Sequence, residues 1–174
     1  MGIIHALVSI AGKESVPLLL ERMKTEKRPN NTSQSDDELY DELYSDSVSV
    51  RETIAQELGG LGSDAADAVP LFATILADEN EAWSVHQAVT VSLGKIGPAA
   101  ARAVPQLLHI LNHDDPDLGE SAVKSLGQIG PAAKRAVPRL STMLNAKETP
   151  ESMKKLIKTA LRQIDPDVLP NKDK

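Results

Sequence analysis

The sequence contains no cysteine and very few aromatic residues. Its 174 residues include no Cys, and aromatic residues make up 2% of the chain. The missing cysteine excludes a disulfide framework, a thiolate nucleophile and a cysteine-based zinc site. It also fits a reducing compartment, so we expect the protein to be cytoplasmic. With so few aromatic side chains, the core has to consist of Leu, Ile, Val and Ala.

An excess of basic residues and a long apolar run are also missing. The formal net charge is −6, whereas nucleic-acid-binding domains normally carry a basic stripe. No apolar run approaches the roughly 18 residues that a membrane-spanning helix needs. The N-terminus lacks the basic segment that opens a signal peptide. We therefore expect no nucleic-acid partner and no membrane insertion.

What the sequence does contain is a repeated segment. The run LGKIGPAAARAVPQLLHIL, residues 93–111, returns almost unchanged as LGQIGPAAKRAVPRLSTML, residues 126–144. The second glycine of this segment corresponds to Gly62, Gly97 and Gly130, which are 35 and then 33 residues apart. A period of this length is typical of stacked helical repeats.

Apolar residues occupy the same positions before each of these glycines. Counted back from the glycine, positions −12, −8, −4 and −1 are apolar in every unit, and Asp165 replaces the glycine in the last one. Steps of four, four and three follow one face of an α-helix, so each unit begins with an amphipathic helix. We expect the glycine to close this helix in the left-handed conformation. The −4 column is Leu58, Leu93, Leu126 and Leu161.

A second amphipathic helix follows each glycine. Pro70, Pro105 and Pro138 stand at position +8, each after Ala-Val, and apolar residues follow at +10, +13 and +14. Proline fits the first turn of a helix, where its missing N–H would have no intrahelical partner. Each unit is thus a helical hairpin that needs stacked neighbours to bury its apolar face. The pattern predicts an all-α solenoid forming a single domain over residues 1–174.

These motifs resemble a known repeat family. The run DSVSVRETIAQELGGLGSDAADAVPLFATILAD and its two echoes resemble HEAT repeats, in particular the HEAT-like repeats of PBS-lyase type, over residues 46–165. The resemblance implies a right-handed superhelix of stacked antiparallel hairpins, with the glycine-ended helices on the concave side. It says little about function, because the family spans scaffolds, adaptors and a few enzymes.

The two ends of the chain depart from the regular repeat. Residues 1–25 fit it weakly, with Leu7 and Ile10 at positions −4 and −1, Ala11 in place of glycine, and a shorter bridge between the helices. They are either a degenerate capping unit or a truncated one whose preceding repeats are absent, and we favour truncation. Residues 166–174 are charged and rich in helix breakers, which predicts a frayed tail.

An insertion occupies residues 24–49 and makes this connection roughly 18 residues longer than its counterparts, as insertions in repeat proteins often do in surface loops. Its segment SDDELYDELYSD is predicted to form a short acidic helix capped by Ser35, with Tyr40 and Tyr44 on one side. The tyrosines either dock a basic partner or hold the insertion against its own solenoid.

No catalytic or metal-binding motif is evident. The segments LGKIG and LGGLG lack the Gly-Lys-Ser/Thr of a phosphate loop. His109 and His113 are four residues apart, but no third ligand is evident beside them. The resembled family includes an iron hydroxylase with His-Glu pairs on its inner helices, and this chain contains no His-Glu pair. No residue supports phycobilin-lyase activity either. We predict no catalytic residue, cofactor or metal.

The remaining candidates lie on exposed columns of the glycine-ended helices. Positions −10 and −6 should face solvent, with position −11 beside them, and Trp83 begins one such helix. These residues either bind a partner or form a solvated face on which Trp83 covers the seam between repeats. We predict a non-enzymatic protein-binding module or scaffold. The alternative is a subunit of a HEAT-like enzyme family, phycobilin lyase-like or, less favoured, an iron hydroxylase. The predicted partner-binding residues are Arg51, Glu52, Trp83, His86, Gln87, Glu120, Lys124, Lys155, Tyr40 and Tyr44.

Overall fold

The computed structural model describes residues 2–26, 38–113 and 115–169, and the side chains of residues 38–47 are outside this description. Throughout these ranges the regular structure is helical, as predicted. The elements are α1 (Gly2–Ala11), η1 (Gly12–Ser15), α2 (Val16–Thr25), α3 (Glu38–Gly60), η2 (Gly62–Ala68), α4 (Val69–Leu76), α5 (Trp83–Ile96), η3 (Gly97–Ala103), α6 (Val104–Ile110), α7 (Pro116–Ile129), η4 (Gly130–Ala136), α8 (Val137–Asn145) and α9 (Glu151–Ile164).

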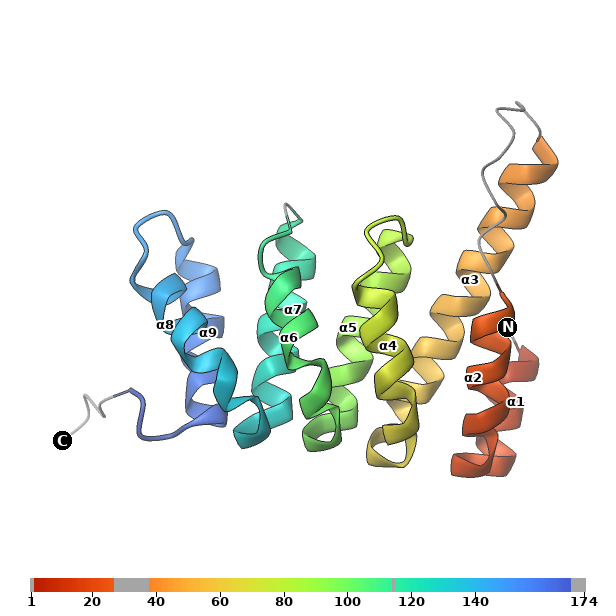
Figure 1. Ribbon diagram of the computed structural model, residues 1–174, viewed down its shortest axis with the longest axis horizontal. Helices are drawn as coiled ribbons and strands as arrows, with labels where there is room; N and C mark the ends of the chain where they lie inside the picture. The colour runs from red at the N-terminus through yellow and green to blue at the C-terminus, as the bar shows by residue number, and fades with distance from the viewer. Residues whose placement is uncertain (1, 27–37, 114, 170–174) are drawn as a thin grey trace.

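The helices form an α-solenoid of two layers (Figure 1). The first helices of the units, α1, α3, α5, α7 and α9, form what we call the glycine layer. The second helices, α2, α4, α6 and α8, form the proline layer, which faces the viewer in Figure 1. From α3 onward, successive helices of the glycine layer contact one another along much of their length, whereas α4 and α6 contact each other little. The closer spacing bends the array towards the glycine layer, which is therefore its concave side.

The core is the aliphatic stripe that the repeat columns predict. All four leucines at position −4 are fully buried, and so are Ile54, Val89, Ala122 and Ile157 at position −8. Phe72 and its counterparts in α6 and α8 are buried from the proline layer. The predicted register of the regular units is therefore confirmed.

The repeat glycines adopt a conformation more restrictive than expected. Gly97 has φ 73° and ψ −140°, and Gly130 has φ 69° and ψ −143°. The positive φ agrees with the prediction, but the ψ lies far from the left-handed helical region. This part of the backbone map is essentially reserved for glycine. A seven-residue 3₁₀ segment that begins at the glycine leads into the next proline-started helix.

A second glycine sets the spacing within the glycine layer. Gly59, Gly94 and Gly127 stand at position −3, beside the backbone of the following helix. A Cβ at Gly59 would lie 2.8 Å from the Ser92 Cα, and one at Gly94 would lie 2.9 Å from the Ser125 Cα. Real Cβ atoms do not approach so closely, so glycine at this position allows the helices to pack at this distance.

The predicted register of the first unit is wrong by one residue. The positive φ that ends this helix belongs to Gly12, at 52°, and not to Ala11. Ile10, expected in the core, is 88% exposed, whereas Ile4 and Val8 pack against the core. The bridge is shorter than in other units, as predicted, with four residues in η1.

The insertion leads into a longer helix than predicted. Instead of a separate short acidic helix, the chain forms one continuous helix, α3, from Glu38 to Gly60. Tyr40 and Tyr44 belong to its first turns, but their side chains lie outside the described residues, as does Ser35. Their predicted roles stay predictions.

The stretch Gly2–Thr25 corrects a second expectation, because by length and composition it is long and apolar enough to cross a membrane. In the structure it contains two ten-residue helices, α1 and α2, which are separated by η1 and both pack against α3. A helix of ten residues is about 15 Å long, roughly half the thickness of a bilayer core.

The predicted frayed tail is also partly ordered. Val168 and Leu169 pack against the core after α9 instead of extending into solvent.

Candidate functional site

A groove opens on the glycine layer between α3 and α5. It has a volume of about 260 Å³. Trp83, the first residue of α5, lies on its wall and is 47% exposed. We call this feature the Trp83 groove. It is lined by Glu52, Gln56, Trp83, Ser84, Gln87, Ala88, Val91, Ser92 and Lys95.

The groove follows the repeat columns. Residues at three positions form its polar rim. Positions −10 and −6 were predicted to face solvent, and position −2 was not among the predicted positions. Position −2 carries the exposed residues Lys95, Gln128 and Gln163. One more step of four along the same helix face would have identified it. A smaller groove of about 160 Å³ between α7 and α9 has Lys124 and Thr159 in its wall, again from position −6.

Several of the predicted binding residues already interact within the protein. The Gln56 side-chain amide donates to Glu52 over 3.0 Å, and the Gln87 amide donates to Ser121 of α7 over 2.8 Å. The second bond connects two glycine-layer helices, so Gln87 stabilises the stacking as well as lining the groove.

The lysines on this face differ in their pairing. Lys124 forms an ion pair with Glu120, at 3.3 Å between Nζ and Oε2. Lys95 and Lys155 are exposed, and neither is in an ion pair with any residue that the structure describes. Lys95 borders the Trp83 groove directly, whereas Lys155 lies on α9 at the far end of the array.

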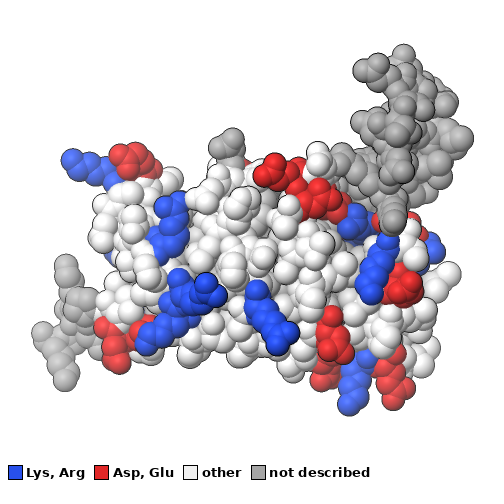
Figure 2. Space-filling view, viewed as in Figure 1, with Lys and Arg blue, Asp and Glu red and all other residues white. Residues whose placement is uncertain are grey.

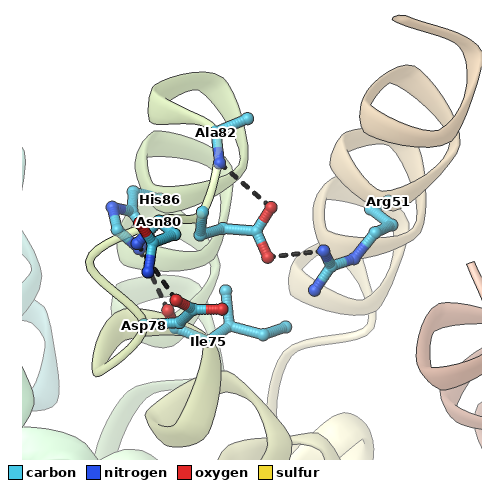
Figure 3. Close-up of polar contacts among 7 residues, drawn as sticks. Arg51, Ile75, Asp78, Asn80, Ala82 and His86 are labelled. Atoms are coloured by element: carbon cyan, nitrogen blue, oxygen red, sulfur yellow. Dashed lines mark hydrogen bonds and ion pairs between the residues drawn. The ribbon is translucent and has the colours of Figure 1, made fainter. Parts of the chain in front are cut away.

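Arg51 lies outside the Trp83 groove. Its guanidinium forms an ion pair with Glu81 at 2.5 Å, and the two side chains are 14% and 5% exposed (Figure 3). The other carboxylate oxygen of Glu81 accepts a bond from the Ala82 backbone N–H at the start of α5. Arg51 therefore connects α3 to the turn that precedes α5, and a partner in the groove does not reach it.

His86 is likewise part of the interior. The residue is 6% exposed, and its Nε2 lies 3.0 Å from the Ile75 carbonyl near the end of α4 (Figure 3). A ring nitrogen that donates there adds a second bond to a carbonyl that already accepts from the Asp78 backbone N–H, over 3.1 Å. His86 thus connects α5 to the last turn of α4, the second helix of the preceding unit.

His86 also lines a cavity of about 290 Å³ with the two histidines noted in the sequence, His109 and His113. The His113 Nδ1 accepts a bond from the Asp115 backbone N–H. Over residues 2–26, 38–113 and 115–169, no three His, Cys, Asp or Glu side chains are grouped closely enough to hold a metal ion.

Two further surfaces are present. A cavity of about 470 Å³ lies between α2, α3 and α4, and its lining includes Glu26 and Arg51. On the proline-layer face, Figure 2 shows basic side chains over the middle and C-terminal part. Arg102, Lys134 and Arg135 are exposed in η3 and η4, and Lys134 is paired with Asp165 at 3.3 Å.

Stacked hairpins of this kind define a helical-repeat solenoid. Residues 37–117, just under half of the chain, match the sequence model for HEAT repeats. This match and the all-α solenoid fold support a HEAT-repeat protein. No curated protein matches it.

Proposed function

We propose that the protein is a non-catalytic interaction module that binds a protein partner on its glycine layer, at the Trp83 groove. HEAT repeats generally mediate protein interactions. The concave side of a solenoid offers an extended surface for such contacts. The single observation that carries the proposal is the exposed indole of Trp83 beside an open groove.

The size of the groove favours a protein partner over a small molecule. Pockets for small ligands usually measure about 300–1,000 Å³, and this groove measures about 260 Å³. It suits one apolar side chain of a partner better than a whole ligand. Tryptophan is among the residues that contribute most to protein interfaces when truncated.

The charges around the groove indicate what the partner should carry. Ala88 and Val91 give the groove an apolar floor, and Lys95 lies on its rim without an ion-pair partner in the described part of the chain. A partner segment with an apolar anchor for Trp83 and a nearby carboxylate for Lys95 would satisfy both. The Glu52 carboxylate, on the α3 side, would disfavour a second acidic group.

Three further expectations belong to this proposal. The Leu-Gly-x-Ile-Gly and Ala-Val-Pro motifs support assignment to the HEAT-like repeats of PBS-lyase type. The lack of cysteine supports a cytoplasmic location. Among the side chains that the structure describes, no arrangement favours the enzyme alternative, and we propose no activity.

The proposal is tested by comparing three immobilised proteins as baits in a crosslinking capture from cells of the source organism. These are the unchanged protein, Trp83→Ala, and Arg102→Ala as a control in η3, outside the Trp83 groove. A specific partner should be retained by the unchanged protein and the control but lost from Trp83→Ala, with the helical circular dichroism unchanged in all three.

A captured partner is then titrated in purified form. Trp83 is the only tryptophan of the chain, so its fluorescence reports the groove directly if a segment of the partner without tryptophan is used. We expect the emission maximum to shift to shorter wavelength as the indole is buried. Saturable binding without any change in emission, or equal binding by Trp83→Ala, would place the interface elsewhere.

A further inference from the structure

Large aliphatic side chains are exposed at the N-terminal end of the array. In the part of the chain that the structure describes, four large hydrophobic residues are exposed, and Trp83 is one of them. The other three, Ile3 at 86%, Ile10 at 88% and Leu18 at 60%, all belong to the hairpin of α1 and α2. No residue of α1 is buried. This end of the solenoid is the right-hand end in Figure 1.

On α1 these residues share one helix face. With Gly12 as the reference, Ile3, Leu7 and Ile10 stand at positions −9, −5 and −2. Spacings of four and three residues place them along one side of the helix. Leu7 is partly buried, and the isoleucines beside it are almost fully exposed.

In later units, the same positions contact the preceding helix of the glycine layer. Ser121 of α7, at −9, accepts the bond from Gln87 of α5. Ser125 of α7, at −5, donates to the Thr90 carbonyl of α5. The face of α1 that carries the isoleucines is therefore the face on which a unit normally stacks.

Leu18 extends this face onto α2. It follows Pro17, and in the later proline-layer helices the residue after the proline also turns to the preceding unit. Arg139 of α8 donates to the Asn112 side chain after α6, over 2.6 Å. We call the set Ile3, Leu7, Ile10 and Leu18 the N-terminal end face.

We propose that the N-terminal end face is a self-association surface, on which two copies of the chain stack hairpin against hairpin around a two-fold axis. An isologous contact places the same patch on both sides, so aliphatic residues meet aliphatic residues. Head-to-tail stacking would instead place them on the outer side of α9. There, positions −10, −7 and −3 carry the exposed side chains Lys155, Lys158 and Arg162.

The residue at position −5 indicates a contact on this face that is less close than the contacts between the regular repeats. Ser92, Ser125 and Ala160 stand there in the closely packed units, each against the backbone of a glycine. A leucine cannot make that approach, so Leu7 does not fit the regular stacking geometry. The α3 helix, with Glu57 at this position, already packs much less closely on α1 than α5 packs on α3.

Sedimentation equilibrium of the purified chain over a wide concentration range tests the proposal. We compare the unchanged protein with the double variant Ile3→Glu/Leu18→Glu, and with Ala99→Glu, at an exposed alanine in η3, as a control for an added surface charge away from this face. Both altered residues are mostly exposed, so circular dichroism should show the same fold in each. Buried glutamates would weaken the pairing strongly, and the dimer dissociation constant should rise by about tenfold or more.

A dimer of the unchanged protein and of Ala99→Glu, weakened in the double variant, supports the proposal. A monomer at every concentration overturns it, and so does a dimer that the double variant leaves unchanged. Flotation with phosphatidylcholine vesicles tests whether the N-terminal end face binds a lipid bilayer instead of a second copy. A protein that is monomeric in solution but floats with vesicles through the N-terminal end face would have a membrane-binding surface instead of a dimer interface.

Discussion

The hydroxyl of Ser92 in α5 donates a hydrogen bond of 2.7 Å to the backbone carbonyl of Ala55 in α3. Ser125 of α7 makes the corresponding bond to the carbonyl of Thr90 in α5, at 2.8 Å. Each serine lies against a glycine of the preceding helix. Small residues on both sides bring the helices close enough for the hydroxyl to reach the backbone. This pairing of glycine with serine fixes the step of the solenoid in its glycine layer.

The first prediction concerns the glycine side of this contact. Gly59→Ala should destabilise the protein by about 1–3 kcal/mol, the usual cost of overpacking. Its new Cβ would lie 2.8 Å from the Ser92 Cα, and a backbone atom cannot move aside as the end of a flexible side chain can.

The neighbouring residue provides the control for this substitution. Gly60 also belongs to α3, but a Cβ built on it meets nothing within 4 Å. Gly60→Ala should therefore stabilise the helix by up to about 1 kcal/mol, because alanine is the better helix former. Urea unfolding followed by circular dichroism measures both. Similar effects of the two substitutions would mean that α3 and α5 are not closely packed at this point.

The second prediction concerns the serine side. Ser125→Ala should cost only about 0.5–1.5 kcal/mol, the net contribution of one hydrogen bond. The packing itself should survive, because the last unit has Ala160 at this position and still packs against Gly127. Urea unfolding gives the value, and the amide of Lys124 in α7 should keep its slow hydrogen exchange. A loss of several kcal/mol would indicate that the hydroxyl has a further partner.

The hairpins and their core could be predicted because each follows from local periodicity. A leucine that recurs four residues before every glycine has to face the same side of its helix. All four such leucines are fully buried. In the first unit the reference position of the repeat was assigned to Ala11 instead of the adjacent Gly12. Only the backbone φ of 52° at Gly12 shows which of the two residues ends the helix.

The candidate site was less predictable, because its contacts connect residues that are far apart in the sequence. Arg51 was chosen as an exposed flanking residue, yet Glu81 buries it from a turn 30 residues later. His86 is buried in the same way by the end of α4. Lys95 was missed because the columns were followed only to position −6. Trp83 is the predicted residue whose exposure the structure shows most directly.

The third prediction tests the core register. Leu126→Ala should destabilise the protein by about 2–5 kcal/mol, since a fully buried leucine leaves a cavity when it is truncated. Leu18→Ala, at a residue that is 60% exposed, should change the stability by less than about 0.5 kcal/mol. Thermal unfolding of both, at a protein concentration too low for self-association, makes the comparison. Equal losses would contradict the burial of the −4 column.

The last prediction concerns the ion pair of Arg51 and Glu81. With side chains that are 14% and 5% exposed, removal of one partner leaves a largely buried charge unpaired. Glu81→Gln should therefore destabilise the protein by up to about 3–5 kcal/mol, and Arg51→Met by a similar amount. The double variant should lose less stability than the sum of the two single losses, with a coupling energy of about 0.5–3 kcal/mol.

Urea unfolding of the unchanged protein, the two single variants and the double variant, in low and high salt, measures this coupling energy. Because the pair is shielded from solvent, salt should change the coupling little. Additive losses would show that the two side chains stabilise the fold independently, and a coupling that disappears in salt would show that the pair is exposed.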